Sequence, residues 1–351
     1  MVIKMNKIIT FIVPAYNVEN YLEKGLHSFL NLEVIENLEV VIVNDGSTDH
    51  TEQIALRYVE KYPSVFKLLN KENGGHGSAI NLGSSVAMGK YFKIIDGDDW
   101  VINENLSLLV RCLAVCEADV VLTPYHMVDM NSGEKIVQRM YIENYNKLYN
   151  LDQITANWKS FDRCMTFHGI MYKTSFYNQY RHELPEGIFY EDQEFATIPC
   201  CYAKTIAAFD LFIYQYLVGN SEQSVSYKNQ VKRITHLERV AINLLNYKKE
   251  NAELPSLHIE YLKRKTEAVI LSYYVVSCII NPDKVAGRKM SNNMYKSVRL
   301  LWPDLFSATR SKYWVYRLFS WFRVGPESYQ KIIHSMAFRL VRRNHGIEKE
   351  N

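Results

Sequence analysis

The sequence predicts an α/β fold in which a mostly parallel sheet is flanked by helices, followed by a mainly α-helical C-terminal region. Over the first hundred residues, apolar runs suited to buried strands alternate with helical segments. Strands separated by helices indicate a parallel, doubly wound sheet. Beyond about residue 230 the pattern becomes helical and basic. We therefore expect two regions, residues 1–230 and residues 231–351.

Four apolar runs are the expected strands of the first hundred residues. They are Ile8–Val13, Leu38–Val43, Phe66–Leu69 and Tyr91–Ile95. Runs that are apolar on both faces suit a sheet covered by helices on both sides.

The helices expected between these strands are marked by spacing and by their first residues. Asn20–Leu30 carries apolar residues at helical spacing. A second helix begins near Ser47–Asp49, which are all good N-cap residues. A third follows the glycine-rich turn Asn73–Gly77. Further on, a helix over Glu104–Cys116 and a strand over Asp119–Leu122 precede less regular segments.

Three of the strands end in polar residues. Pro14-Ala15-Tyr16-Asn17 follows the first, Asn44-Asp45-Gly46-Ser47 the second and Asp96-Gly97-Asp98-Asp99 the fourth. In doubly wound sheets, ligands bind beyond the carboxyl ends of the strands. The three segments should therefore meet in one crevice.

The acidic cluster after the fourth strand favours a bound cation. Asp96, Asp98 and Asp99 would lie a few ångströms apart, which is costly unless a cation neutralises them. Mg²⁺ and Mn²⁺ prefer oxygen ligands and commonly share them with a phosphate. The alternative is a polar turn in which Asp is only a turn former.

Composition limits the class of protein. The chain has 351 residues and 48% hydrophobic content, enough for one large core with an appendage or for two domains. Its six cysteines form no convincing metal pair or disulfide framework, so we expect a reduced, cytoplasmic protein. No signal peptide is expected, and the longest later apolar stretch, Ala268–Ile280, is too short to span a bilayer.

Charge is unevenly distributed along the chain. The net charge is +3, but residues 231–351 carry 22 basic and 10 acidic residues, a balance of +12, which leaves −9 for residues 1–230. Such asymmetry indicates two regions with different partners.

The motifs of the first half, taken together, resemble a known family. They are I-V-P-A-Y-N (12–17), V-N-D-G-S-T-D (43–49), E-N-G-G-H-G-S-A-I-N (72–81), G-K-Y (89–91) and D-G-D-D-W (96–100). Their order and spacing are similar to those of the family-2 inverting nucleotide-sugar glycosyltransferases, which have the GT-A fold. The similarity is close over residues 6–130 and resumes at F-Y-E-D-Q-E (189–194).

The resemblance implies a site for the donor nucleotide. The turn of Pro14, Ala15, Tyr16 and Asn17 would pack on the base and ribose, and Asp45 would hydrogen-bond the base, usually uracil. The donor would then be a UDP-sugar.

It also implies a metal site for Mn²⁺ or Mg²⁺. Asp98 would be the favoured ligand, Asp96 would lie nearer the ribose or a metal-bound water, and Asp99 would be an extra ligand. Carboxylates repel a diphosphate, so they can help it leave only by holding a cation that acts as a Lewis acid.

In the glycine-rich segment, Gly75 would let the backbone approach the donor. His76 could face the donor sugar. The alternatives are a strand-to-helix turn that needs glycine and a histidine with only local hydrogen bonds.

The catalytic base implied by the resemblance is Asp192, beside Glu191. It would take the proton of the acceptor hydroxyl as that oxygen attacks and inverts the anomeric carbon. The alternative is a solvated charge cluster. Ser224 and Ser226 lie where relatives often close a loop over the pyrophosphate.

Two departures from the family pattern matter. Ile80 stands where many relatives have arginine, so a donor-side or structural contact is missing or supplied elsewhere. The motif Q-x-x-R-W of processive members has only a partial match at Gln230–Ile234, which lacks the tryptophan. We therefore expect a non-processive enzyme.

Two amphipathic stretches lie between Lys312 and Arg343. The first groups Trp314, Leu318, Trp321 and Phe322, and the second groups Ile332, Ile333, Met336, Leu340 and Val341. Basic amphipathic helices with Trp and Phe can lie on anionic membranes. The alternatives are packing on the protein's own core or on a second subunit as a homodimer. No nucleic-acid-binding motif accompanies the charge.

The sequence thus predicts a non-processive glycosyltransferase that moves a sugar from a UDP-sugar to a hydroxyl of a glycan or lipid-linked acceptor, in cell-surface polysaccharide or glycoconjugate synthesis. It would work in the cytoplasm, peripherally at the inner face of the cell membrane. One alternative is a nucleotide-sugar-binding partner subunit without activity. A nucleotidyltransferase is disfavoured, because P-A-Y-N-V-E-N (14–20) is not a glycine-rich, basic phosphate loop.

Overall fold

The computed structural model describes residues 7–145, 147–219 and 227–333. These residues divide into two compact units, the first drawn from residues 1–223 and 253–262 and the second from residues 224–252 and 263–351. The division near residue 230 expected from the sequence stays a prediction.

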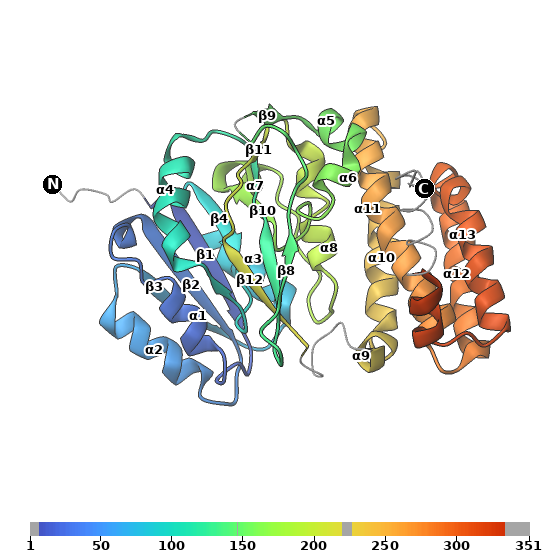
Figure 1. The fold of residues 1–351 in the computed structure, drawn as a ribbon, viewed down its shortest axis with the longest axis horizontal. Helices are drawn as coiled ribbons and strands as arrows, with labels where there is room; N and C mark the ends of the chain where they lie inside the picture. Colours follow the sequence, from blue (N-terminus) through green and yellow to red (C-terminus); the bar gives the residue numbers. More distant parts are fainter. Residues whose placement is uncertain (1–6, 146, 220–226, 334–351) are drawn as a thin grey trace, which may run out of the picture. The chain divides into compact units, whose positions relative to one another are not determined.

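An eight-stranded sheet forms the centre of the first unit (Figure 1), in the order β3-β2-β1-β4-β10-β6-β11-β9. Its strands are β1 (Ile9–Ala15), β2 (Leu38–Asp45), β3 (Phe66–Lys71), β4 (Tyr91–Ile94), β6 (Val120–Leu122), β9 (Leu148–Tyr149), β10 (Ile170–Lys173) and β11 (Ile206–Ala208). β3, β2, β1 and β4 run parallel, and β10 runs antiparallel to both β4 and β6. The predicted α/β fold with a mostly parallel sheet is confirmed.

Helices connect the parallel strands, as the sequence predicts. The helices of this unit are α1 (Leu22–Ser28), α2 (Thr51–Lys61), α3 (His76–Val86), α4 (Leu106–Val115), α5 (Leu151–Ala156), α6 (Trp158–Phe161), α7 (Thr174–Gln179) and α8 (Asp192–Phe195). Short 3₁₀ turns lie at Ile35–Asn37, Asn103–Asn105 and Pro199–Tyr202. The helices α1 and α4 are each shorter than expected: Asn20 lies in a turn before α1, Glu104 lies in the 3₁₀ turn before α4, and Leu30 and Cys116 lie beyond the last helical residues.

The main core lies where α1 and α4 pack on the sheet. Phe11 of β1 is fully buried, and its ring lies 4.8 Å from that of Phe29, which follows α1. Leu22 and Leu26 of α1 belong to the same cluster. Burying such apolar surface is the main force that holds helix and sheet together.

The other sheet has the order β5-β12-β7-β8, and all of its strands except β5 lie in the less regular part of the sequence beyond residue 122. Its strands are β5 (Trp100–Val101), β7 (Tyr125–Asp129), β8 (Lys135–Gln138) and β12 (Tyr214–Val218). None is longer than five residues. Runs this short do not show a reliable period in the sequence.

The second unit is helical. It contains α9 (Tyr227–Lys232), α10 (Ile234–Glu250), most of α11 (Ser256–Val275), α12 (Lys284–Leu301) and α13 (Pro303–Trp321), and a π-helical turn, Val276–Ile280, follows α11. The predicted helical C-terminal region is confirmed. Within the described ranges, no helix is both long enough and apolar enough to cross a membrane. Much of the second predicted amphipathic stretch, from Met336 on, lies outside the described residues.

Candidate active site

The three polar segments predicted to meet lie at one edge of the main sheet. β2, β1 and β4 are parallel neighbours, so their carboxyl ends point to the same edge. Ala15 at the end of β1 is paired with Asn44 of β2. Pro14 and Ala15 are buried, whereas the side chain of Tyr16 is 51% exposed. Tyr16 is therefore the member of this turn that can present a ring to a ligand.

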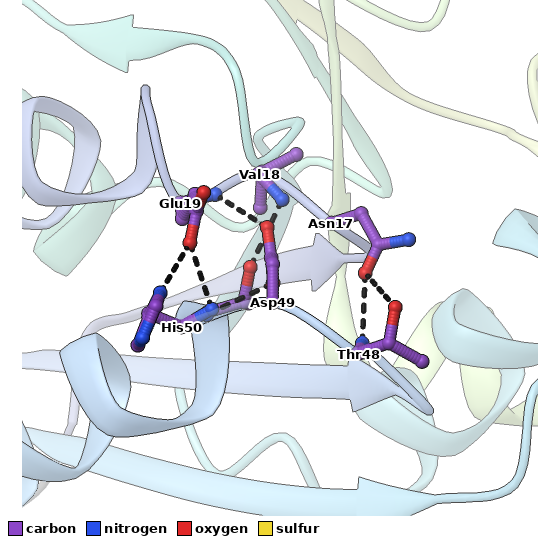
Figure 2. Close-up of polar contacts among 7 residues, drawn as sticks. Asn17, Val18, Glu19, Thr48, Asp49 and His50 are labelled. Atoms are coloured by element: carbon purple, nitrogen blue, oxygen red, sulfur yellow. Dashed lines mark hydrogen bonds and ion pairs between the residues drawn. The ribbon is translucent and has the colours of Figure 1, made fainter.

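The loops that follow β1 and β2 are joined by polar contacts (Figure 2). Asn17, with a left-handed φ of 52°, accepts a 2.8 Å hydrogen bond from the backbone N–H of Thr48 through its Oδ1 atom. The N–H of Glu19 donates to Asp49 at 3.1 Å, and Glu19 in turn accepts from the N–H of His50 at 2.9 Å. These contacts fix both loops beside the sheet edge.

The same contacts correct the predicted start of α2. The helix begins at Thr51, not near Ser47–Asp49. Ser47 accepts from the N–H of Asn17, and Asp49 accepts from the N–H groups of Glu19 and Thr51. The predicted N-cap side chains are therefore used largely to hold the neighbouring loop.

Asp45 anchors the glycine-rich segment. Its carboxylate accepts from Lys71 Nζ at 2.8 Å and from the N–H groups of Gly74 and Gly75 at 2.9 and 2.8 Å. Asp45 is only 2% exposed. The structure thus gives it a task the sequence did not reveal, while its contact with a base stays a prediction.

Two glycines let the start of α3 approach the loop before α8. Gly75 has φ 87° and ψ 171°, and a Cβ there would lie 3.1 Å from the backbone nitrogen of Gly187. A Cβ at Gly77 would lie 2.8 Å from the carbonyl oxygen of Pro185. The N–H of Gly187 also donates to the carbonyl of Gly74 at 2.7 Å. The glycine motif therefore contacts the loop that carries the predicted catalytic residues.

His76 joins two of the predicted acidic groups. Its Nδ1 atom lies 2.6 Å from Glu191 Oε1, and its Nε2 atom lies 3.0 Å from Asp96 Oδ1. Burial disfavours the charged imidazole, but the Asp96 and Glu191 carboxylates together raise the pKa of His76 well above its usual value. The imidazolium in turn holds the pKa of Asp96 below its usual range, although burial opposes this. The result is a carboxylate–imidazolium–carboxylate chain.

Glu191 and Asp192 differ in exposure. Glu191 is 2% exposed, and its Oε2 atom has no hydrogen-bond partner among the described residues. Asp192 is half-buried at the first position of α8, where Gln193 Nε2 donates to it at 3.0 Å. Tyr190, just before them, has φ 72°, a strained conformation for a residue other than glycine. Asp192 is therefore the more accessible of the two carboxylates.

Asp99 is held by β12. Tyr214 donates its hydroxyl to Asp99 Oδ2 at 2.6 Å, and the N–H of Leu217 donates to Oδ1 at 2.7 Å. Burial, together with the neighbouring carboxylates of Asp98 and Asp96, raises the pKa of Asp99 well above its usual value. The part of this shift that comes from Asp98 and Asp96 is the cost of crowded like charges that the sequence predicted.

The residues present fit a divalent cation. Within the described part of the chain, ligand atoms of Asp96, Asp99 and His168 lie within 4.8 Å of one another. Carboxylate oxygens suit Mg²⁺ and Mn²⁺. Burial lowers the pKa of His168 to about 4, so its neutral imidazole can also be a ligand. Asp98, the favoured ligand expected from the sequence, is half-buried beside this group without belonging to it.

His168 was missed by the sequence reasoning. It lies just before β10, in a segment without a recognisable period, and the only cue was a His-Gly pair. Its ring stacks on that of Tyr216 at 4.2 Å. Burial raises the pKa of Tyr216, and so do the charges of Asp99, Asp96, Asp98 and Asp192, in that order. Four of the predicted site carboxylates therefore act on the side chain of Tyr216.

Comparison with known proteins finds similarity that is concentrated in the first half of the chain. The family model described as Glycosyl transferase family 2 matches residues 10–179. The chain is 31% identical over 182 residues to the glycosyltransferase GlyA of Streptococcus pneumoniae serotype 4, covering 50% of this chain and 26% of GlyA. It is 26% identical over 308 residues to EpsH, a provisionally named glycosyltransferase of Bacillus subtilis (strain 168), covering 87% of this chain and 86% of EpsH.

A further relative is the minor teichoic acid biosynthesis protein GgaB of Bacillus subtilis (strain 168). It is 35% identical over 126 residues, covering 35% of this chain and 14% of GgaB. The alignments thus span about a quarter of GlyA and less of GgaB.

Solved structures share the fold. TarS of S. aureus, residues 1–349 in complex with UDP-GlcNAc, has a TM-score of 0.64 at 20% identity, with 92% of each chain covered. TarS 1–349 in another crystal structure has a TM-score of 0.54 at 20% identity, covering 87% of this chain and 92% of that one.

Proposed function

We propose, from the premise that residues 10–179 form a glycosyltransferase family 2 domain with a GT-A fold, that this chain transfers a sugar from a UDP-sugar to an acceptor hydroxyl. One observation carries the proposal. His76 links Asp96, on the donor side of the sheet edge, to Glu191, which adjoins the predicted base Asp192. The segments that would bind the donor and carry the base, at Asp96 and at Glu191-Asp192, are therefore linked through one histidine, which supports the proposal.

The donor would be held at the ends of β1 and β2. Tyr16 is exposed there and can pack on a base, and Asn17 is fixed by the loop after β2. The complex of TarS with UDP-GlcNAc supports a UDP-sugar as the donor class.

A divalent cation would be held by Asp96 with Asp99 and His168, and Asp98 is a further ligand in reach. When bound, Mn²⁺ or Mg²⁺ would neutralise the charge that develops on the leaving diphosphate. Before it binds, the imidazolium of His76 balances the charge of Asp96.

Asp192 would accept the proton of the attacking hydroxyl, which then displaces UDP in a single step with inversion. Glu191 is buried and bonded to His76, so its role would be to position the loop. In this proposal Asp192 is the base and Glu191 is a positioning residue.

We further propose a non-processive enzyme with a glycan or lipid-linked acceptor. The resemblance to GgaB supports a role in cell-surface polysaccharide synthesis. All six cysteines are free, which supports work in the reducing cytoplasm.

A thermal-shift panel tests the donor class. UDP, GDP, CDP and several UDP-sugars are compared, each with Mn²⁺ and with EDTA. A ligand at about 100 times its dissociation constant should add roughly 2.7 kcal/mol to the free energy of unfolding. We expect stabilisation by UDP species that requires metal. No shift with any nucleotide, for folded protein, would instead favour a partner subunit without activity.

A further inference from the structure

Helix α13 exposes a stripe of large apolar side chains. Trp314, Leu318, Trp321 and Phe322 are 59%, 55%, 71% and 76% exposed. Their spacing of four, three and one residues puts them on one side of the helix. The opposite side of α13 is buried. We call the four side chains the α13 face.

Basic side chains border the α13 face. The guanidinium of Arg288, from the neighbouring helix α12, lies 5.5 Å from the ring of Trp321. Arg310 and Arg323 are exposed before and after the stripe. Residues 284–323 contain nine Lys or Arg and a single acidic residue, Asp304. The α13 face therefore combines exposed aromatic rings with basic groups at its borders, on a pair of helices that is rich in basic residues.

Exposed apolar surface of this kind marks an interaction site. Trp and Phe on one side of a helix with Arg and Lys at its borders are typical of helices that lie in a membrane interface. We propose that the α13 face binds the surface of an anionic lipid bilayer. The rings would enter the boundary between headgroups and acyl chains, and the flanking basic groups would contact the lipid phosphates.

Charge argues against a second copy of this chain as the occupant. In a symmetric dimer the same patch meets itself. The basic groups beside each stripe, Arg288, Arg310 and Arg323, would then be brought close to the same groups of the other copy. Such a like-charge contact is unfavourable, whereas an anionic bilayer complements it.

This inference goes beyond sugar transfer, and its test needs no activity. The full chain is mixed with vesicles of phosphatidylcholine alone or of an equal mixture with phosphatidylglycerol. Bound protein is measured by flotation at low and high salt. We expect binding to the mixed vesicles only, weakened by salt, with a blue shift of tryptophan fluorescence.

Paired variants separate binding through the α13 face from nonspecific binding through other exposed apolar side chains. Trp314→Ser with Trp321→Ser should weaken the partition coefficient by about tenfold or more. The matched control is Leu32→Ser with Val115→Ser, which removes two side chains that are 81% and 84% exposed in the first unit. The control should bind like the wild type.

Charge variants test whether the basic side chains contribute to lipid binding. Lys289, Lys296 and Arg299 are exposed on α12. Changing each to Gln should weaken binding by about fivefold per residue. The control changes Arg57 and Lys61, exposed on α2, to Gln.

Three outcomes would overturn the proposal. The first is no binding to either vesicle. The second is equal binding by the tryptophan variant and the wild type, both shown to be folded by thermal unfolding. The third is a dimer in solution that the tryptophan substitutions dissociate, which would make the α13 face a contact between copies.

Discussion

At the scale of single residues, His76 connects the two parts of the candidate site, Asp96 after β4 and Glu191 before α8. One ring nitrogen contacts Glu191 and the other contacts Asp96, and the side chain is 29% exposed. The sequence offered two roles for this residue, a donor contact and a local hydrogen bond. The geometry adds a third, because the imidazole links the loop before α8 to the end of β4.

Replacing His76 by Asn should destabilise the metal-free protein at low pH most. The folded-state pKa of His76 is raised, so the stability it adds is fully present below its usual pKa of 6.5 and is lost as pH rises through the raised value. Breaking its charged hydrogen bonds should cost about 1–3 kcal/mol.

The measurement is urea unfolding in EDTA across this pH range. His27→Asn, at an exposed position of α1, is the control. A difference between His76→Asn and the wild type that does not shrink with rising pH would contradict the charged chain.

Asp192 and Glu191 should give different phenotypes. Asp192→Asn should slow donor hydrolysis by about 10²–10⁴-fold, because water then lacks a base, while the thermal shift with donor is kept. Glu191→Gln should also lower stability, since Glu191 is buried against His76.

The matched control is Glu186→Gln, exposed in the same loop. Donor hydrolysis is followed as release of nucleoside diphosphate. Full activity of Asp192→Asn would exclude this residue as the base.

At the scale of elements, the start of α3 decides where the loop before α8 lies. Gly75 and Gly77 allow backbone to approach Gly187 and Pro185. Asn81 of α3 fixes the same loop, because it donates to the carbonyl of Leu184 at 2.9 Å and accepts from its N–H at 3.0 Å. The helix that begins at the glycine-rich segment thus also places the residues before Asp192.

Gly75→Ala should lower the free energy of unfolding more than Gly133→Ala does. The φ and ψ of Gly75 lie in a region that is essentially open to glycine alone, with a cost of about 1–3 kcal/mol for other residues. The added Cβ would also crowd Gly187.

Gly133→Ala is the control, because Gly133 has φ 70° but nothing within 4 Å of an added Cβ. Urea unfolding measures both variants, and donor hydrolysis should fall only for Gly75→Ala. Equal losses of stability would mean that the close approach adds nothing.

At the scale of the whole molecule, a buried lysine ties the antiparallel part of the sheet to the parallel part. Lys93 of β4 is fully buried and donates to the carbonyls of His168 and Ile170 at 2.6 and 3.2 Å. Burial lowers its pKa to about 7. The loop that bears His168 is therefore fixed from the centre of the sheet.

Lys93 should make stability depend on pH. Between pH 7 and 10.5 the unfolded chain binds the proton that folded Lys93 has lost, so its contribution to the free energy of unfolding rises with pH. The slope should be about 1.4 kcal/mol per pH unit. The variant Lys93→Met should lack this part of the pH dependence of the free energy of unfolding.

The test is the difference in unfolding free energy between wild type and Lys93→Met across that range, with Lys61→Met, exposed on α2, as the control. A difference independent of pH would show that Lys93 is charged in the folded protein.

Much of this protein can be read from its sequence. Long apolar runs predicted β1 to β4, because a sheet covered on both faces leaves a strong local signal. The polar residues at the ends of those strands predicted the site edge, because parallel strands bring their carboxyl ends together. The basic charge and aromatic spacing of the last third were equally visible.

Only the tertiary structure decided which side chains complete the candidate site. His168, Tyr214 and Leu217 come from or beside short strands, and Tyr214 reaches Asp99 across 115 positions of sequence. The link between His76 and Glu191 also spans 115 positions. Local patterns cannot specify such partners, because they depend on how antiparallel β10 and the second sheet pair. The sequence determined which polar groups stand at the strand ends. Long-range packing decided which other side chains contact those groups.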